Sequence, residues 1–235
     1  MTRTSTWLAT LALGLGLTST AMAGDDNGNF MIRLQGTSLV TQDKTKSLTL
    51  NGANIQPAYD ASVSNEVIPT ATLTYFFNKN LAVELLCCFA KHEIDLSGPV
   101  NGKVGSMWIF PPALTLQYHF TGMGAFKPYV GAGAQYIHYF KEKGGPAATT
   151  LAAQDLSLSD SFGPVIQAGF DLGLGGGWVL NADIKKSWLD TKATWSGTNT
   201  VVGKVDVDPL VLSAGLGYRF NLDDIFGRRS AAPLK

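Results

Sequence analysis

Charged residues are scarce in this sequence of 235 residues: Asp, Glu, Lys and Arg together make up only 15%, and the formal net charge is zero. A net charge near zero gives no reason to expect a nucleic-acid partner. Beyond the first residues, no apolar run approaches the roughly 20 residues that a membrane-spanning helix needs. Few charges without a helical span favour a transmembrane β-barrel, in which each strand alternates apolar and polar residues.

Cysteine and histidine are also rare, with two and three residues respectively. Cys87 and Cys88 are adjacent, and adjacent side chains of a strand point to opposite faces, so neither a disulfide nor a shared metal is expected. A lipid hydrolase would need a Ser–His pair facing lipid. His138 shares its face with Tyr136 and Phe140, without a serine. The sequence therefore predicts no enzyme activity, no metal and no cofactor.

The first 23 residues have the organisation of a secretory signal peptide. Arg3 precedes a short apolar run from Trp7 to Leu17, and Ala21-Met22-Ala23 is a small-x-small cleavage site. This run is too short to cross a bilayer. We therefore expect cleavage after Ala23, a barrel at 24–220 and a periplasmic C-terminal tail at 221–235.

Eight segments of alternating polarity follow the signal peptide. They are 29–40, 67–77, 81–96, 107–120, 128–140, 161–174, 178–194 and 205–220. The connections alternate in length, with long ones at 41–66, 97–106, 141–160 and 195–204 and short ones at 78–80, 121–127 and 175–177. Short turns at one end and long loops at the other are typical of outer-membrane barrels. The predicted fold is all-β, an eight-stranded antiparallel transmembrane β-barrel; a soluble lipocalin-like barrel would have the reverse polarity.

The inward side chains divide by height into two groups. Towards the periplasm and at mid-barrel they are polar: Arg33, Gln35, Glu84, Gln117, His119, Asp171, Asn181, Asp183, Lys185 and Arg219. The interior of an eight-stranded barrel is about filled by its own side chains. This polar belt therefore favours a hydrogen-bonded plug, in which Glu84 pairs with Arg33, Lys185 or Arg219, over a selectivity filter.

Towards the long loops the inward side chains become apolar. They are Leu39, Ile68, Met107, Ile109, Pro111, Ile137, Val165, Leu189, Val207 and Pro209. Two interpretations are open: the loops pack into this cup and close it, or the cup binds small hydrophobic molecules. Since the plug blocks the axial route, such a solute would leave sideways through the wall. The strand prolines Pro69, Pro111, Pro112, Pro164 and Pro209 would weaken strand pairing there.

Several motifs carry a family resemblance. They are PPALTLQYHF (111–120), KPYVGAGAQY (127–136), LAVELL (81–86) followed by KHEI (91–94), GGGWVLNADIKK (175–186) and VDPLVLSAGLGYRF (207–220). Together they resemble the outer membrane protein W (OmpW) family, which includes AlkL-like uptake barrels, from about Phe30 to Phe220. The resemblance implies an eight-stranded barrel of the bacterial outer membrane with a hydrophobic extracellular-side channel. One departure is that the family's chains typically end at the aromatic matching Phe220, whereas this chain continues.

The expected function is that of a porin-like channel. It would pass small hydrophobic molecules from an apolar extracellular-side pocket laterally into the membrane. The alternative is a structural or surface-interaction barrel whose loops at 41–66 and 141–160 bind a partner. The expected partners are outer-membrane lipids, small hydrophobic solutes and the barrel-assembly machinery.

Overall fold

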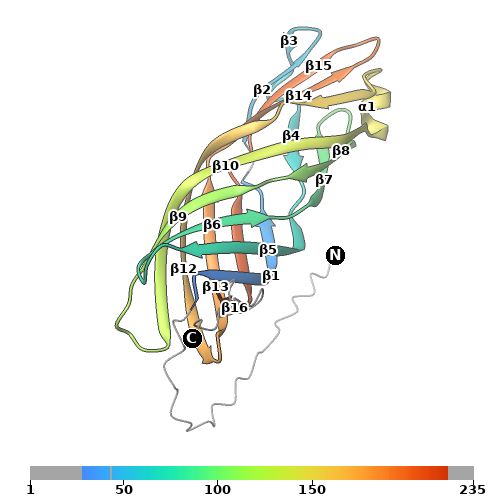
Figure 1. Ribbon diagram of the computed structural model, residues 1–235. Helices are drawn as coiled ribbons and strands as arrows, with labels where there is room; N and C mark the ends of the chain where they lie inside the picture. The colour runs from blue at the N-terminus through green and yellow to red at the C-terminus, as the bar shows by residue number, and fades with distance from the viewer. Residues whose placement is uncertain (1–27, 43, 222–235) are drawn as a thin grey trace, which may run out of the picture.

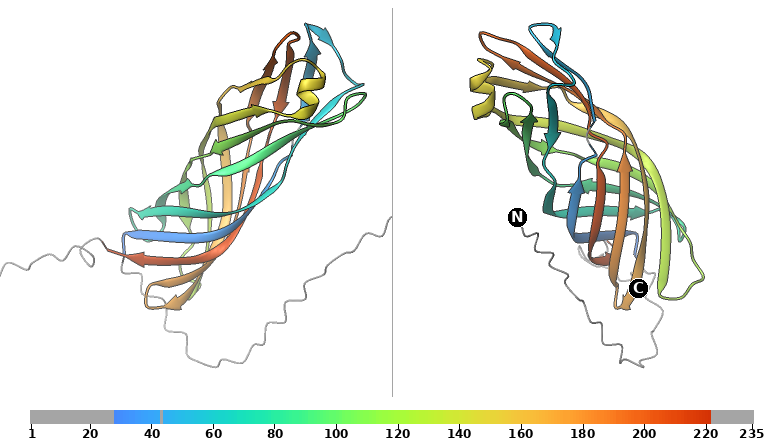
Figure 2. Two further views of the ribbon diagram at one scale, coloured as in Figure 1. Left: turned by 90° about the vertical axis from the view of Figure 1, so that its right-hand side faces the viewer. Right: turned by 180° about the vertical axis from the view of Figure 1, so that it is seen from behind.

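A closed ring of eight antiparallel strands forms the body of the molecule in the computed structural model, which describes residues 28–42 and 44–221 (Figures 1 and 2). In order round the ring these strands are β1 (Phe30–Val40), β5 (Glu66–Phe76), β6 (Leu81–Cys87), β9 (Ala113–His119), β10 (Phe126–Gly144), β12 (Ser161–Gly175), β13 (Trp178–Ser187) and β16 (Leu210–Phe220). The last strand pairs with the first from Phe30↔Phe220 to Val40↔Leu210, which closes the ring. The predicted fold class is confirmed. The signal peptide expected at 1–23 and, Asn221 apart, the tail at 221–235 lie outside the described residues.

Beyond the ring, the chain continues as β-hairpins on the extracellular side (upper part of Figure 1). The elements there are β2 (Lys44–Leu50), β3 (Ala53–Asn54), β4 (Asp60–Val63), β7 (Ala90–Ser97), β8 (Gly102–Phe110), α1 (Pro146–Thr150), β11 (Asp155–Leu158), β14 (Asp190–Ser196) and β15 (Val201–Asp206). They form two groups of paired strands, β10-β8-β7-β4 and β11-β14-β15-β2-β3. The long connections were thus wrongly predicted as loops, because much of each is strand. No helix of the described chain is long and apolar enough to cross a membrane.

Four predicted long strands are each two strands. The segment 81–96 breaks at Cys88-Phe89, and 107–120 breaks at Pro111-Pro112, where two successive residues lack an N–H for the ladder. The segments 178–194 and 205–220 break at Trp188-Leu189 and at Val207–Pro209. These breaks separate the ring from the extracellular sheets, so the prediction of continuous strands was wrong there.

The outer surface of the ring is a band of large apolar side chains. Exposed members of this band include Leu34, Leu73, Leu85, Leu114, Leu116, Val130, Ile166, Leu180, Ile184, Leu212 and Leu216. Aromatic side chains border it at both ends: Phe30 stacks on Phe220 near the short turns, and Phe89 stacks on Phe110 at the opposite end, with ring centroids 6.0 and 5.0 Å apart. An apolar band between two aromatic girdles suits a surface in contact with lipid.

The short turn between β12 and β13 depends on glycine. Gly175, Gly176 and Gly177 have φ values of +92°, +59° and +84°. A residue with a Cβ is strained in this left-handed region, whereas glycine adopts it freely. The three glycines therefore let the chain reverse within a tight periplasmic turn, at the place where a short connection was predicted.

Candidate functional site

Arg33 lies at the centre of a buried polar belt that crosses the barrel lumen. Its Nε donates to Oδ1 of Asp171 at 3.1 Å, and its Nη2 donates to Oδ2 at 2.7 Å. Its Nη1 donates to Oε2 of Glu84 and to Oγ1 of Thr74, each at 2.7 Å. The two parallel bonds to Asp171 are the strong, bidentate form of an arginine–carboxylate contact. Arg33 thereby joins β1 to β5, β6 and β12 through the interior.

Lys185 of β13 completes the charged part of the belt. Its Nζ lies 3.2 Å from Oε1 of Glu84 and also contacts Oδ1 of Asp183. The second Asp183 oxygen accepts a hydrogen bond from the Tyr129 hydroxyl at 2.9 Å. A Cβ at Gly169 would lie 2.6 Å from the Tyr129 ring, so the absence of a side chain there makes room for this tyrosine. Both cations of this cluster are paired with carboxylates.

The predicted belt residues come together, with Arg219 at their periplasmic edge. Those that are buried are Arg33, Gln35, Glu84, Gln117, His119, Asp171, Asn181, Asp183 and Lys185. Arg219 is half-buried; its guanidinium stacks on the Phe76 ring at 3.8 Å, and its Nε donates to the Gly28 carbonyl at 2.7 Å. Of the three cations predicted to pair with Glu84, Arg33 and Lys185 do so.

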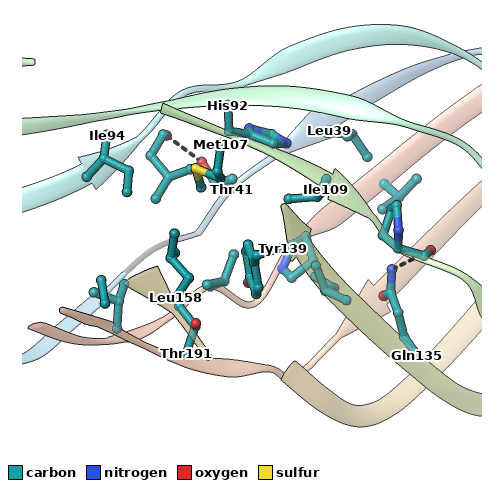
Figure 3. Close-up of a pocket in the computed structure, with 18 of the residues that line it drawn as sticks. Leu39, Thr41, His92, Ile94, Met107, Ile109, Gln135, Tyr139, Leu158 and Thr191 are labelled. Carbon is teal, nitrogen blue, oxygen red and sulfur yellow. Dashed lines mark hydrogen bonds between the residues drawn. The ribbon is translucent and has the colours of Figure 1, made fainter. Parts of the chain in front are cut away.

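An apolar pocket lies above the belt, with a space of about 970 Å³ that includes its part open to solvent. Figure 3 shows Ile94, Met107 and Ile109 on one side of it and Tyr139 and Leu158 on the other. Ring strands and extracellular strands both contribute to its walls. The pocket therefore extends from the barrel lumen into the space between the two extracellular sheets.

Most of the predicted cup residues line this pocket. They are Leu39, Met107, Ile109, Pro111, Ile137, Val207 and Pro209. The other three lie elsewhere: Leu189 belongs to the surrounding apolar core, Ile68 packs against that core, and Val165 is buried in the wall of β12. Further lining residues come from strands in segments that were predicted to be loops, among them Leu48, Leu158 and Trp195. Their alternating pattern was the available signal, but it was assigned to irregular structure.

The extracellular end of the pocket is covered by a packed cap. Leu48 and Trp195 of one sheet lie in the same buried cluster as Val104 of the other and Ala148 of α1. Trp195 Nε1 donates to the Val104 carbonyl at 2.9 Å, which joins the two sheets directly. The extracellular segments thus pack over the top of the cup, as the first interpretation predicts, and leave a pocket beneath them.

The wall beside the pocket contains an unpaired stretch, which we call the window. The backbone ladder between β5 and β6 ends at the pair Ala71↔Cys87. The next backbone hydrogen bond on this side is the one that Ser64 N–H, just before β5, donates to the Glu93 carbonyl of β7 at 3.0 Å. Between these points, β5 residues 66–70 pair with β1 alone. Pro69 lies within this stretch and offers no N–H. The window is thus a stretch of wall without a backbone ladder between β5 and the β6–β7 junction.

Two side chains with reactive or titratable groups line the pocket near the window. Cys88 is buried with its thiol free, whereas Cys87 is exposed, as their adjacency predicts. His92 lies beyond the Phe89 girdle, and its Nδ1 is 2.9 Å from the Ser64 carbonyl. Burial lowers the pKa of His92 from 6.5, although the Ser64 hydrogen bond opposes this shift. The imidazole is therefore neutral at neutral pH, and the pocket wall carries no charge there.

An outward-facing pair lies near the upper girdle. His138 Nδ1 is 3.0 Å from Oδ1 of Asp160, and the Tyr136 hydroxyl donates to the other oxygen of the same carboxylate. Sequence reasoning missed Asp160, because it was assigned to a loop. A His–Asp pair resembles part of a hydrolase triad, but in the described chain His138 hydrogen-bonds to Asp160 alone and not to a hydroxyl or thiol nucleophile. No cluster of three potential metal ligands occurs among the described residues.

Comparison with known proteins gives concordant matches. The model of the OmpW family matches residues 26–220. An outer-membrane protein of Sinorhizobium fredii, y4mB, is 38% identical over 81% of this chain and 80% of its own length. Outer membrane protein W of Vibrio cholerae is 30% identical over 89% and 97% of the two chains.

Two solved structures extend the similarity to three dimensions. The crystal structure of outer membrane protein OprG from Pseudomonas aeruginosa aligns with a TM-score of 0.79 at 31% identity, covering 85% of this chain and 99% of that one. The solid-state NMR structure of outer membrane protein AlkL in lipid bilayers aligns with a TM-score of 0.68 at 26% identity, covering 96% and 100%.

Proposed function

Because the chain belongs to the OmpW family, a family of outer-membrane barrels and not of enzymes, we propose that it passes small hydrophobic molecules from the extracellular side laterally into the membrane. The protein lies in the bacterial outer membrane. The observation that carries the proposal is the apolar pocket, which stands directly above a belt of paired charges and beside the window. Its predicted lining residues act as the binding site in this proposal.

The belt directs the route of the solute. An apolar molecule that moved straight down the lumen would have to separate Arg33 from Asp171 and Glu84, all of which are buried. Breaking a buried pair costs about 3–5 kcal/mol when one charge loses its partner. An apolar solute supplies no replacement hydrogen bonds, so the axial route is closed to it. The belt acts as the plug of the proposed channel.

The window supplies the lateral route. Thr70 and Cys88 line the pocket on its two sides, and on the outer surface Val67 is 79% and Phe89 57% exposed. No backbone ladder has to be broken for β5 and the β6–β7 junction to separate further. A solute leaving here enters the apolar band without contacting water. Access from outside requires the cap around Trp195 to part.

The experiment compares an inward and an outward charge in the same strand. Ile109→Asp places a carboxylate in the pocket, whereas Ser106→Asp, also in β8, lies outside the lining residues. In cells that display equal amounts of heat-resistant folded barrel, Ile109→Asp should reduce uptake of an apolar tracer to the level of barrel-free cells. Ser106→Asp should retain wild-type uptake. Equal uptake by both variants and the wild type would refute the pocket as the route.

A second candidate function is attachment to a surface partner through the extracellular strands. It is favoured by their construction, since the β2–β15 and β14–β15 pairings give the projecting segments a regular shape. Replacing residues 51–54, which lie outside the pocket lining, by a short glycine-serine linker tests it. Loss of partner adhesion with retained tracer uptake supports attachment, and loss of uptake alone supports the channel. We also expect the barrel-assembly machinery to insert the chain.

A further inference from the structure

The pocket has a polar floor beneath its apolar walls, and nothing in the proposed passage of hydrophobic molecules requires one. Thr37 and Thr70 line the pocket at its lower end, on β1 and β5. Their hydroxyl oxygens lie 2.6 Å apart, and Thr37 also donates to the Ser213 hydroxyl at 2.8 Å. The floor on this side is therefore a row of three hydroxyl groups.

One hydroxyl group of this row has acceptor positions that no group of the described chain fills. Thr37 gives its one proton to Ser213, so Thr70 must be the donor in the bond between the two threonines. The Thr70 oxygen then accepts no hydrogen bond from the described chain, although it faces the pocket. A hydroxyl oxygen has two acceptor positions. Thr70 therefore offers acceptor positions to a molecule in the pocket.

Two polar atoms without a hydrogen-bond partner lie immediately below Thr70. Gln35 is its register partner on β1, and Thr72 is the next inward residue of β5. These residues are only 6% and 2% exposed, and Gln35 Oε1 and Thr72 Oγ1 have no hydrogen-bond partner in the described structure. Buried polar atoms are nearly always partnered in folded proteins. Their concentration between β1 and β5 marks a place that accommodates a polar group.

We propose that this β1–β5 floor is a subsite for the uncharged polar end of an amphipathic solute, such as a medium-chain alcohol, whose apolar chain fills the pocket above. The inference rests on the proposed function and specifies its substrate class. An alcohol donates its hydroxyl proton to the Thr70 oxygen, which has acceptor positions to offer. The subsite lies on β5, so the polar end is held beside the window.

The same geometry disfavours carboxylates and plain alkanes as ligands of the floor. A carboxylate needs a cation, but Arg33 and Lys185 are both paired with carboxylates of the belt. Burying an unpaired charge is far more costly than burying a neutral hydroxyl. A plain alkane leaves the floor unfilled, and a site with buried hydrogen-bonding groups discriminates against analogues that lack the matching group. The expected order is alcohol, then alkane, then carboxylate.

The test measures initial uptake of radiolabelled octanol, octane and octanoate by intact cells, each corrected for barrel-free cells. The wild type should favour octanol over octane. Thr70→Val removes the acceptor and should lower the octanol-to-octane ratio by about tenfold, as expected for one lost hydrogen bond in an apolar site. Thr70→Ser retains the hydroxyl and should keep the ratio. Thr194→Val, on the partly exposed face of β14, is the matched control and should also keep it.

The outcomes separate the two proposals. If the wild type takes up none of the three solutes faster than barrel-free cells, the proposed function itself fails. If it takes up octane and octanol and Thr70→Val leaves their ratio unchanged, the subsite is refuted while the channel stands. If Thr70→Val does not fold, the wild type alone still tests the subsite. An uptake of octanol that is no faster than that of octane overturns the subsite. Inhibition of octane uptake by unlabelled octanol, but not by unlabelled octanoate, supports it.

Discussion

Arg33 and Asp171 face each other across the barrel lumen from β1 and β12, joined by two hydrogen bonds of 3.1 and 2.7 Å. The same guanidinium holds Glu84 of β6 at 2.7 Å. One side chain thus connects strands that are distant in the sequence and not neighbours in the ring. The belt is therefore a structural brace of the barrel, and in the proposed channel it is also the barrier on the axis.

Replacing Arg33 by Met should destabilise the barrel strongly. The change leaves the Asp171 and Glu84 carboxylates buried with fewer partners, which costs about 3–5 kcal/mol for a broken buried pair. Urea titration of the folded, heat-resistant band measures the loss. The triple variant Arg33→Met with Asp171→Asn and Glu84→Gln should recover part of it, because the unpaired charges are removed together. Lys192→Met, on an exposed lysine of β14, is the control; a similar loss there would contradict the brace.

Cys88 and Cys87 provide an internal test of the window. Cys88 lines the pocket, and Cys87 is exposed on the lipid side of the same strand end. With Cys87→Ser, a lipid-soluble maleimide should modify Cys88 and block tracer uptake, whereas a charged, membrane-impermeant maleimide should react slowly. With Cys88→Ser, labelling of Cys87 should leave most of the uptake intact. Faster reaction of Cys88 with the charged reagent would show that access comes from the water side and would contradict a lateral route.

The alternation of polarity predicts the ring and its two faces because a strand repeats every two residues. Each predicted belt residue except Arg219 is buried, and Cys87 and Cys88 lie on opposite faces. The same alternation continues into the extracellular segments, but the sequence does not mark these segments as strands that pair above the ring. Trp195 and Leu48 were missed because 195–204 and 41–66 were predicted to be loops, although both residues are buried above the pocket.

The window could not be predicted from the sequence. Prolines indicate where a ladder is weak, but of the five candidates only Pro69 lies in the unpaired stretch. Pro164 sits opposite Ala134 in a continuous ladder. Whether a missing donor opens a gap depends on which neighbouring strand ends nearby, and here β6 ends at Cys87. That is a property of strand lengths and register, which only the folded arrangement defines.

His92 should make solute binding sensitive to acid. Its folded pKa is lowered from 6.5 by burial, so the unfolded state binds the proton more readily than the folded state. The stability that the neutral imidazole contributes is therefore present above 6.5 and is lost as the pH falls from 6.5 through the lowered value. Tracer retention should be constant above about pH 7 and decline in that acidic window. His92→Gln cannot titrate and should flatten the profile; an unchanged profile would contradict the role of His92.

We expect Trp195 to control access to the pocket from outside, because its indole joins the two extracellular sheets through the Val104 carbonyl at 2.9 Å. Trp195→Ala removes this bond and the largest side chain of the cap, at a cost of about 3–5 kcal/mol for a buried tryptophan. The loss falls on the extracellular sheets, since the paired charges of Arg33 and Lys185 lie in the ring. The variant should therefore keep its heat-resistant mobility but take up an apolar tracer faster than the wild type. Trp195→Phe retains most of the volume without the donor and should be intermediate. Slower uptake by both variants, with folding intact, would mean that the cap is part of the binding wall and that solutes reach the pocket elsewhere.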